Sequence, residues 1–168
     1  LEFRRVLFRS NNFLAAITIA GEHWGLAYAD ISTGEFFTTQ GQDLGTLTLE
    51  LLRLQPSEVL VPANAPDIHS LLRPGEKSEH LPGYLPDCFC YSLRSQLPFS
   101  LTEAKPRLLT AFGVRSLEGM GCEHLPLAIR AAGGLLEYIE DTQKAYQVPL
   151  QPLRSEEHTS ELQSQFRI

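Results

Sequence analysis

Two cysteine-containing pairs are the residues whose types could bind a metal ion. Cys88 and Cys90 lie two residues apart, and Cys122 lies two residues before His124. Together they offer the thiolate and imidazole ligands of a tetrahedral zinc site. The first pair is closer than the usual C-x2-4-C spacing, and on a strand residues i and i+2 face the same side, as core residues do. We therefore expect buried cysteines and no metal.

Asp30 is the strand carboxylate that could serve a nuclease. Two-metal nucleases need several carboxylates at one site, and the predicted first strand, 12–19, contains no acidic residue. Asp30 precedes Ile31-Ser32-Thr33-Gly34, where an aspartate side chain typically caps a turn. We expect that structural role. The alternative is a metal-dependent nuclease of ribonuclease-H type that combines Asp30 with Glu103 or Glu123, which predicts that these carboxylates converge.

The remaining residue types do not assemble a nucleophile, a general base and an orienting group. The histidines have no serine or cysteine relay. Gly119-Met120-Gly121 lacks the preceding strand and third glycine of a dinucleotide-binding loop, so we expect a turn. Tyr28, Phe36 and Phe37 alternate without interleaved basic residues, which disfavours a platform for single-stranded nucleic acid. The residues predict a domain without catalytic, cofactor-binding or metal-binding residues.

The composition limits the classes of protein to which the chain can belong. The 168 residues are 43% hydrophobic and 20% charged, which is typical of one globular domain. No run approaches the roughly 18 apolar residues that suggest a membrane span. The chain has 3 cysteines, too few for a disulfide framework, which favours the cytosol. A net charge of −6 disfavours a nucleic-acid-binding surface spread over the whole chain.

The two ends of the chain are related through their coding DNA. Residues 1–10 read LEFRRVLFRS, and a DNA strand encoding them has a reverse complement that encodes RSEEHTSELQ, the sequence of residues 154–163. A protein has no physical reason to carry its own antisense at both ends. We interpret 1–10 and 154–168 as translated sequencing adapter and exclude them from reasoning about the fold. Removing their five arginines and four glutamates from 14 basic and 20 acidic residues leaves 9 and 16, a net charge of −7.

Between these ends, the first half predicts a mixed sheet. Strands expected at 12–19, 24–31 and 35–40 are joined by short turns, which indicates an antiparallel meander. Leucines at helical spacing from Leu44 to Leu54, with Asp43 as N-cap, predict a helix that ends before Pro56. SEVLVP, residues 57–62, has the composition of a buried parallel strand. This order of elements is typical of a ribonuclease-H-like α/β fold with flanking helices.

The second half is expected to be irregular and then helical. Prolines between residues 62 and 100 indicate loops, with a helical turn or two at 67–72 and a short strand at 88–92. Thr102 is expected to cap a helix that tolerates Pro106 and ends at Gly113. Its predicted core residues are Leu108, Leu109 and Phe112.

The longest helix is expected from about Leu125 to Ala145. Its exposed side is expected to carry a Glu140–Lys144 pair, and Gly133-Gly134 indicates a close approach of another element. Its predicted apolar stripe is Ala128, Ala132, Leu135, Leu136 and Ile139.

Six segments, in this order and spacing, resemble a known family: NNFLAAI, GLAYADISTGEF, LQPSEVLVP, LLTAFGV, AIRAAGGLLEYIEDTQK and VPLQPL. The family is that of the MutS mismatch-repair proteins, and the resemblance is to their connector domain. YADISTGEF and AAGGLLEYIEDTQK are its most specific parts. The resemblance implies a connector-like domain over 11–147 and the start of a link to the lever domain at 148–153. It also implies a ribonuclease-H-like fold without the nuclease site.

The resemblance implies docking and coupling within a longer protein. A MutS connector is expected to link mismatched-DNA binding to the ATPase and to offer a surface to MutL. Mismatch-reading, ATP and Mg binding are expected in other domains of a cytoplasmic, homo-oligomeric parent without a membrane partner. For MutL we choose the polar side of the helix after Thr102: Glu103, Lys105, Pro106 and Arg107. An ordinary solvated helix face is the alternative for each of them.

Overall fold

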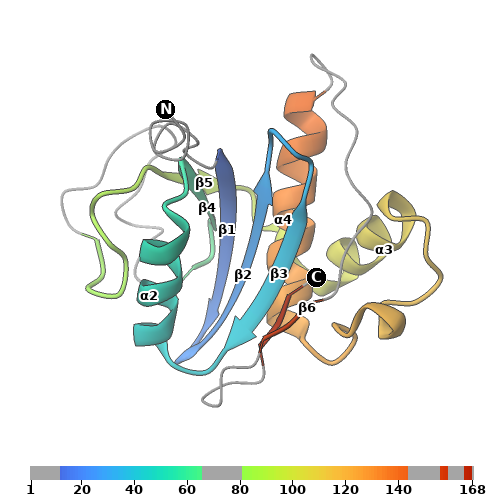
Figure 1. Cartoon of the computed structure of the whole chain (residues 1–168), viewed down its shortest axis with the longest axis horizontal. Helices are drawn as coiled ribbons and strands as arrows, with labels where there is room; N and C mark the ends of the chain where they lie inside the picture. Colours follow the sequence, from blue (N-terminus) through green and yellow to red (C-terminus); the bar gives the residue numbers. More distant parts are fainter. Residues whose placement is uncertain (1–11, 66–80, 144–155, 159–164, 168) are drawn as a thin grey trace, which may run out of the picture.

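The computed structural model of the chain describes residues 12–65, 81–143, 156–158 and 165–167. Their main feature is a five-stranded mixed sheet of order β3-β2-β1-β4-β5 (Figure 1). β1 (Phe13–Ala20), β2 (His23–Asp30) and β3 (Phe36–Gly41) form the predicted antiparallel meander. β4 (Glu58–Pro62) pairs in parallel with β1, and β5 (Tyr91–Arg94) pairs in parallel with β4. The predicted ribonuclease-H-like α/β fold is confirmed.

Two tight turns create the meander. Gly21, at φ +65°, opens the two-residue turn between Ala20 and His23, a conformation in which glycine avoids the strain of a Cβ atom. The second turn lies between β2 and β3, where the amide of Gly34 donates to the carbonyl of Asp30 at 2.7 Å. Both turns lie where the sequence predicts them.

Helix α2 (Leu44–Leu54) forms as its capping and leucine spacing predict. The Asp43 side chain accepts from the amide of Gly45 at 2.9 Å, which satisfies one of the free N–H groups at the helix start. The helix stops because Gln55 is left-handed, at φ 51°, and its amide returns to the carbonyl of Leu51. The predicted end is correct, although Gln55 is not extended as expected of a residue before proline.

The sheet separates two hydrophobic cores. One face is covered by α2, and the other by α4 (Pro126–Gln143) with α3 (Leu101–Ala111) beside it (Figure 1). Side chains alternate along β1, so that Leu14 and Ala16 face α4 while Ala15 and Ile17 face α2. The predicted stripe of α4 is fully buried: Ala128, Ala132, Leu135, Leu136 and Ile139.

The glycine pair of α4 marks a close helix contact, as predicted. A Cβ atom added to Gly133 would overlap Ala104 of α3, and one added to Gly134 would overlap the ring of Phe99. Phe99 belongs to the short 3-10 helix η1 (Leu97–Phe99) that precedes α3. The pair therefore lets η1 and α3 approach the backbone of α4.

The start of α3 differs from the prediction. Ser100 occupies the N-cap position because its carbonyl accepts from the amides of Glu103 and Ala104, and Thr102 is the second residue inside the helix. Pro106 is consequently in the helix interior. Gly113 follows the helix at φ +65°, as predicted. Of the predicted core residues, Leu108 is buried, whereas Leu109 and Phe112 are half-buried.

Three further predictions are corrected or lie outside the described residues. The strand predicted at 88–92 begins only at Tyr91, where the parallel register with Val59 starts. Glu140 forms an ion pair with Arg107, and its predicted partner Lys144 lies outside the described residues, so the Glu140–Lys144 pair stays a prediction. The helical turn predicted at 67–72 also lies outside them.

The remaining described elements are short. The 3-10 helix η2 (Glu118–Met120) ends at left-handed Gly121, which confirms a turn at this glycine pair. β6 (Glu156–His158) and β7 (Gln165–Arg167) form a separate antiparallel ribbon, of which β7 lies next to β3. No helix among the described residues is long and apolar enough to cross a membrane.

Candidate functional site

The four residues predicted to bind a partner lie along the outer side of α3. Glu103 and Pro106 are exposed, while Lys105 and Arg107 are half-buried. On the inner side of the same helix, Ala104 is fully buried against the glycine pair of α4. The packing of α3 on α4 thus determines which side chains of α3 point outward. We refer to Glu103, Lys105, Pro106 and Arg107 as the α3 face.

Open grooves lie on both sides of Pro106. The polar groove, of about 300 Å³, is lined by Glu103, Pro106, Arg107, Thr110, Ala111 and Glu140. The apolar groove, of about 410 Å³, is lined by Leu101, Thr102, Lys105, Pro106 and Leu109. Every residue of the α3 face therefore lines at least one groove. Both grooves are shallow depressions that are wide open to solvent, and neither is an enclosed pocket.

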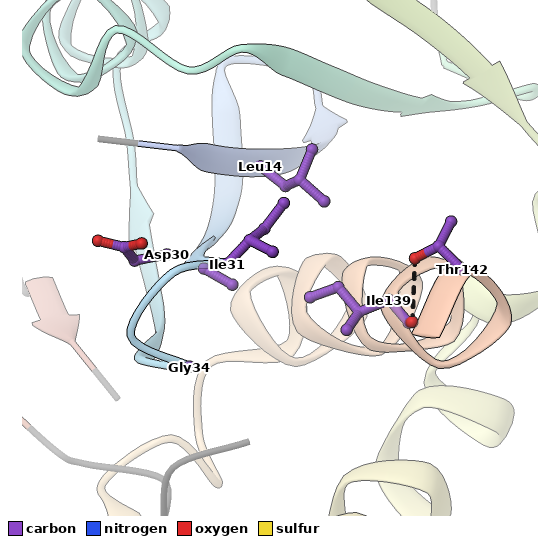
Figure 2. A pocket seen from close by; sticks show the side chains of 7 residues that line it. Leu14, Asp30, Ile31, Gly34, Ile139 and Thr142 are labelled. Carbon is purple, nitrogen blue, oxygen red and sulfur yellow. Dashed lines mark hydrogen bonds between the residues drawn. The ribbon is translucent and has the colours of Figure 1, made fainter. Parts of the chain in front are cut away.

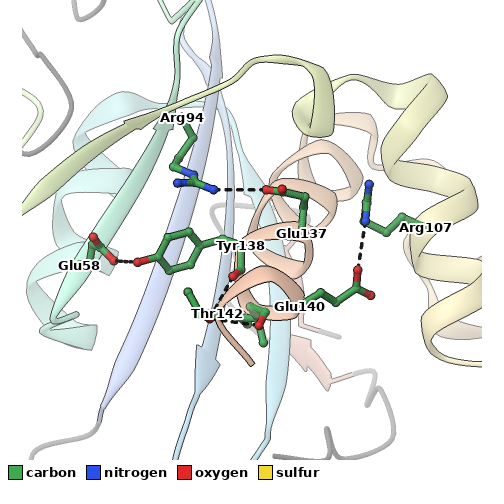
Figure 3. Close-up of polar contacts among 8 residues, drawn as sticks. Glu58, Arg94, Arg107, Glu137, Tyr138, Glu140 and Thr142 are labelled. Atoms are coloured by element: carbon green, nitrogen blue, oxygen red, sulfur yellow. Dashed lines mark hydrogen bonds and ion pairs between the residues drawn. The ribbon is translucent and has the colours of Figure 1, made fainter. Parts of the chain in front are cut away.

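The basic residues of the α3 face are paired within the chain. Lys105 Nζ lies 2.5 Å from Glu123 Oε1. Arg107 Nη1 lies 3.0 Å from Glu140 Oε2 (Figure 3). These pairs are partly exposed, so each stabilises the fold by at most about 1 kcal/mol. Arg107 Nε is buried and has no acceptor within the described residues. The guanidinium is thus fixed by one hydrogen bond and keeps an unused donor.

Asp30 performs the predicted structural role in the β2–β3 turn. Its Oδ1 accepts from the amide of Ser32 at 2.9 Å, and also from the Ser32 hydroxyl. A cavity of about 30 Å³ adjoins it, lined mainly by apolar residues including Leu14, Ile31 and Ile139, and the carboxylate points away from Ile139 (Figure 2). This space is too small for a substrate and is no larger than one or two water molecules. Asp30 lines this cavity together with Thr142, near the C-terminal end of α4, whereas Glu123 precedes the N-terminal end of that helix, so these two carboxylates of the nuclease alternative lie far apart.

The cysteines do not share one environment. Cys122 is buried in the core under α4, and burial, reinforced by the nearby Glu123 charge, raises the pKa of its thiol to about 12. Cys88 and Cys90 are exposed, which corrects the expectation that they are buried. They flank Phe89, which alone enters the core on the α2 side, because they precede β5 rather than lying within it. Among the described residues, no three or more His, Cys, Asp or Glu side chains gather as a metal site.

Polar side chains of the sheet hold the N-terminal end of α4. The hydroxyls of Thr18 and Thr38 donate to the carbonyls of Leu127 and Ala128, at 2.9 and 2.7 Å. The side-chain oxygen of Gln40 accepts from the amides of the same two residues, at 2.9 and 3.2 Å. Gln40 thus satisfies two of the N–H groups that the first helical turn leaves without an intrahelical partner, and the two threonines add buried hydrogen bonds to its carbonyls.

A second polar cluster holds α4 nearer its C-terminal end (Figure 3). The Tyr138 hydroxyl donates to Glu58 Oε1 at 2.8 Å, and Ser92 donates to Glu58 Oε2 at 2.7 Å. Arg94 lies 4.7 Å from the centre of the Tyr138 ring and 3.6 Å from Glu137. Burial, followed by the hydrogen bond to Glu58, raises the pKa of Tyr138 to about 12, so the phenol remains a donor at neutral pH.

The sequence reasoning missed both sets of residues that hold α4. A signal for the first set exists, because Thr18 and Thr38 are polar residues that follow the buried apolar residues Ala16 and Phe36 by two positions on their strands. The second set joins residues of β4, β5 and α4 that are up to 80 positions apart, and no local pattern reveals them. We refer to Thr18, Thr38, Gln40, Glu58 and Tyr138 as the α4 clamps.

The sequence of the chain matches a known family and several known proteins. The sequence model of MutS domain II matches residues 12–154. The DNA mismatch repair protein MutS of Microcystis aeruginosa is 74% identical over 147 residues, which are 88% of this chain and 17% of that protein. The MutS of Synechocystis is 72% identical over 88% of this chain and 17% of that protein. The MutS of Nostoc punctiforme is 74% identical over 86% of this chain and 16% of that protein. The chain therefore spans about a sixth of the length of the curated relatives it matches.

Proposed function

The chain belongs to the MutS domain II family, and on that basis we propose that it is the non-catalytic connector of a DNA mismatch repair protein. In this role it couples mismatched-DNA binding to an ATPase located elsewhere in the parent and offers a docking surface to MutL. The observation that carries the proposal is the family match over residues 12–154. The parent, by the same proposal, is a cytoplasmic homo-oligomer that binds mismatched DNA, ATP and Mg through its other domains.

Residues 11–153 are the unit to which we assign this function. The antisense relation between 1–10 and 154–163 supports an adapter origin for both ends, and the family match runs from residue 12 to residue 154. The turn-capping role of Asp30 supports a non-catalytic domain, since its carboxylate is already occupied by Ser32.

The α3 face is the surface we assign to MutL. It combines the exposed Glu103 and two half-buried, paired basic residues with two grooves, and α3 is fixed from beneath by the glycine contacts with α4. A surface that is ordered before binding does not spend binding free energy on ordering. This preorganisation favours the α3 face over an ordinary solvated helix face.

Coupling is supported by the α4 clamps. They tie α4 to four of the five strands, namely β1, β3 and β4 directly and β5 through Ser92 and Arg94. In the sequence, α4 is followed by residues 148–153, which resemble the junction to the lever domain. A helix held at both ends transmits a rotation of the sheet to its C-terminal end as one rigid body.

Charge reversal at Arg107 tests the docking surface. Residues 12–153 would replace the matched segment in the MutS of Microcystis aeruginosa, and MutL recruitment to mismatched DNA would be measured for the chimera with and without Arg107→Glu. Reversal breaks the Arg107–Glu140 pair and leaves two carboxylates side by side on the α3 face. A partner that is complementary to the paired surface would then meet two additional negative charges, which disfavours binding. We expect MutL affinity to fall at least tenfold.

Arg53→Glu is the matched control for this experiment. Arg53 also pairs with a glutamate, Glu50, at 2.7 Å, but on α2 at the opposite face of the sheet. It should leave MutL recruitment within twofold of the unmodified chimera. Equal recruitment by all three proteins would rule out the α3 face as the MutL surface.

A further inference from the structure

Helix α2 leaves two of its leucines in water. Leu49 is 66% exposed and Leu52 is 41% exposed, and residues three positions apart lie side by side on the surface of a helix. The inner side of the same helix is already filled, because Leu47, Leu51 and Leu54 are buried in the core between α2 and the sheet. The exposed pair therefore forms an apolar surface that the core of this domain does not use. We refer to Leu49 and Leu52 as the α2 patch.

The charged residues beside the α2 patch neutralise each other. Arg53 Nη2 lies 2.7 Å from Glu50 Oε2, and these two are the charged residues of the helix. An unpaired charge would lose its water at a high cost if another surface covered it, whereas a paired charge at the edge of a contact can stay solvated. The chemistry of the α2 patch therefore suits an apolar neighbour and offers no net charge to an ionic one.

The size of the α2 patch indicates which kind of neighbour can cover it. A stable interface between two separate proteins buries roughly 1,200–2,000 Å² in total, with about 20–30 residues on each side. An 11-residue helix with two exposed leucines falls well short of that. A neighbour within the same chain needs much less area, because a short tether gives it an effective concentration on the order of millimolar.

The first strand of the domain begins beside the C-terminal end of α2. The carbonyl of Phe13, the first residue of β1, accepts from the amide of Ser57 at 2.8 Å and from its hydroxyl at 3.0 Å. Ser57 follows the last residue of α2 by three positions, and Phe13 packs against the core on the α2 side. In contrast, α4, which ends at Gln143, covers the other face of the sheet (Figure 1). A neighbour tethered at residue 12 is therefore the one closest to the α2 patch.

We propose that the α2 patch packs against an apolar surface of the domain that precedes residue 12 in the parent. The family model is that of domain II, a numeral that indicates a first domain before it, and the match covers only 17% of the MutS of Microcystis aeruginosa. Aliphatic or aromatic side chains of the first domain contact Leu49 and Leu52, and the Glu50–Arg53 pair lies at the edge of the contact. The contact fixes the orientation of the first domain on the sheet.

This inference rests on the family assignment and is independent of the proposed docking of MutL, because α3 and α2 lie on opposite faces of the sheet. Photo-crosslinking in the chimera described above identifies what covers the α2 patch. The variant Leu49→p-benzoylphenylalanine is irradiated without MutL or DNA, and the cross-linked peptides are identified by mass spectrometry. We expect a cross-link within one chain, to a residue that precedes the matched segment.

The matched control is the same photoreactive residue in place of Leu97, which is 61% exposed in η1 beside α4. It should not cross-link to the peptides that Leu49→p-benzoylphenylalanine captures. A cross-link from position 49 to a residue after the matched segment, or to a second chain at twice the mass, would overturn the inference. The absence of any cross-link from that position would overturn it as well.

Leu49→Lys/Leu52→Lys measures whether the contact holds the first domain in place. Both side chains are exposed and lysine is a good helix former, so the domain should remain folded and cleavage within residues 12–153 should not change. Limited proteolysis of the connection before residue 12 should become at least threefold faster in the chimera, because two buried ammonium groups disfavour the contact. Unchanged cleavage of this connection, or equal acceleration by Leu97→Lys, would contradict the proposal. MutL recruitment should stay within twofold in all these variants, so this inference and the docking surface can fail separately.

Discussion

At the scale of single residues, burial and the neighbouring carboxylate of Glu58 both raise the pKa of Tyr138. Both favour the protonated phenol, and its pKa is raised from 10.0 to about 12. A group whose pKa is raised by folding stabilises the folded state fully below its unfolded pKa, and that stability is lost as the pH rises through the folded pKa. Tyr138 therefore stabilises the fold below about pH 10 and ceases to do so between pH 10 and about 12.

Tyr138→Phe tests this linkage. The substitution keeps the ring under Arg94 but removes the hydrogen bond to Glu58, so we expect the free energy of unfolding at pH 8 to fall by about 1 kcal/mol. The difference between the two proteins should then shrink as the pH is raised from 10 toward 12. Urea unfolding at a series of pH values measures it, and Cys122, which titrates in both proteins, cancels in the difference. A difference that does not change with pH would contradict the assigned role of the phenol.

At the scale of elements, the contact between α3 and α4 depends on glycines that oppose helix propensity. Gly133→Ala should gain about 1 kcal/mol of propensity, but the added Cβ atom overlaps Ala104, including its Cα atom, which cannot rotate away. We expect a net loss of stability of about 1–2 kcal/mol, because overpacking at such a contact outweighs propensity. Thermal or urea unfolding of the full chain measures it.

Gly45→Ala in α2 is the matched control. The added Cβ atom would lie 3.4 Å from Asp43 Oδ1, an ordinary contact, so propensity should prevail and stability should rise by about 0.5–1 kcal/mol. Opposite signs for the two substitutions would confirm that backbone proximity, and not helix propensity, governs the α3–α4 contact. A stabilising Gly133→Ala would mean that α3 lies farther from α4 than described.

The elements also show what sequence reasoning can and cannot reach. α2 was predictable, because its cap at Asp43 and its leucine spacing are local signals. The start of α3 was misjudged because Ser100 and Thr102 are both acceptable caps, and η1 decides between them by placing the Ser100 carbonyl beneath the amides of Glu103 and Ala104. The exposure of Cys88 and Cys90 depends on where β5 begins, which is a property of sheet register and not of local composition.

The candidate site was predictable only in outline. A helix with an exposed polar side could be located from the sequence, and its four residues do lie on one outer face. The polar groove could not be predicted, since it lies between α3 and Glu140 of α4, where Arg107 reaches a residue 33 positions away. The α4 clamps likewise depend on contacts between distant strands and the helix.

At the scale of the whole molecule, the sheet and α4 form one body with two outer surfaces. α2 presents exposed leucines on one face, and the α3 face with its two grooves lies on the other. The α4 clamps link the sheet to the helix that leads into the next part of the chain. If the domain couples distant sites, the clamps must hold while the parent changes its conformation.

Mismatch-dependent ATP turnover of the chimera tests this central claim most directly. The variant Thr38→Val/Gln40→Ala/Tyr138→Phe removes clamps at both ends of α4 and leaves the α3 face unchanged. Melting of the variant domain first establishes that it remains folded. We predict that the variant still binds mismatched DNA and still hydrolyses ATP, but that mismatched DNA no longer changes its rate of turnover. A variant whose ATP turnover responds to a mismatch as strongly as that of the unmodified chimera would contradict the account.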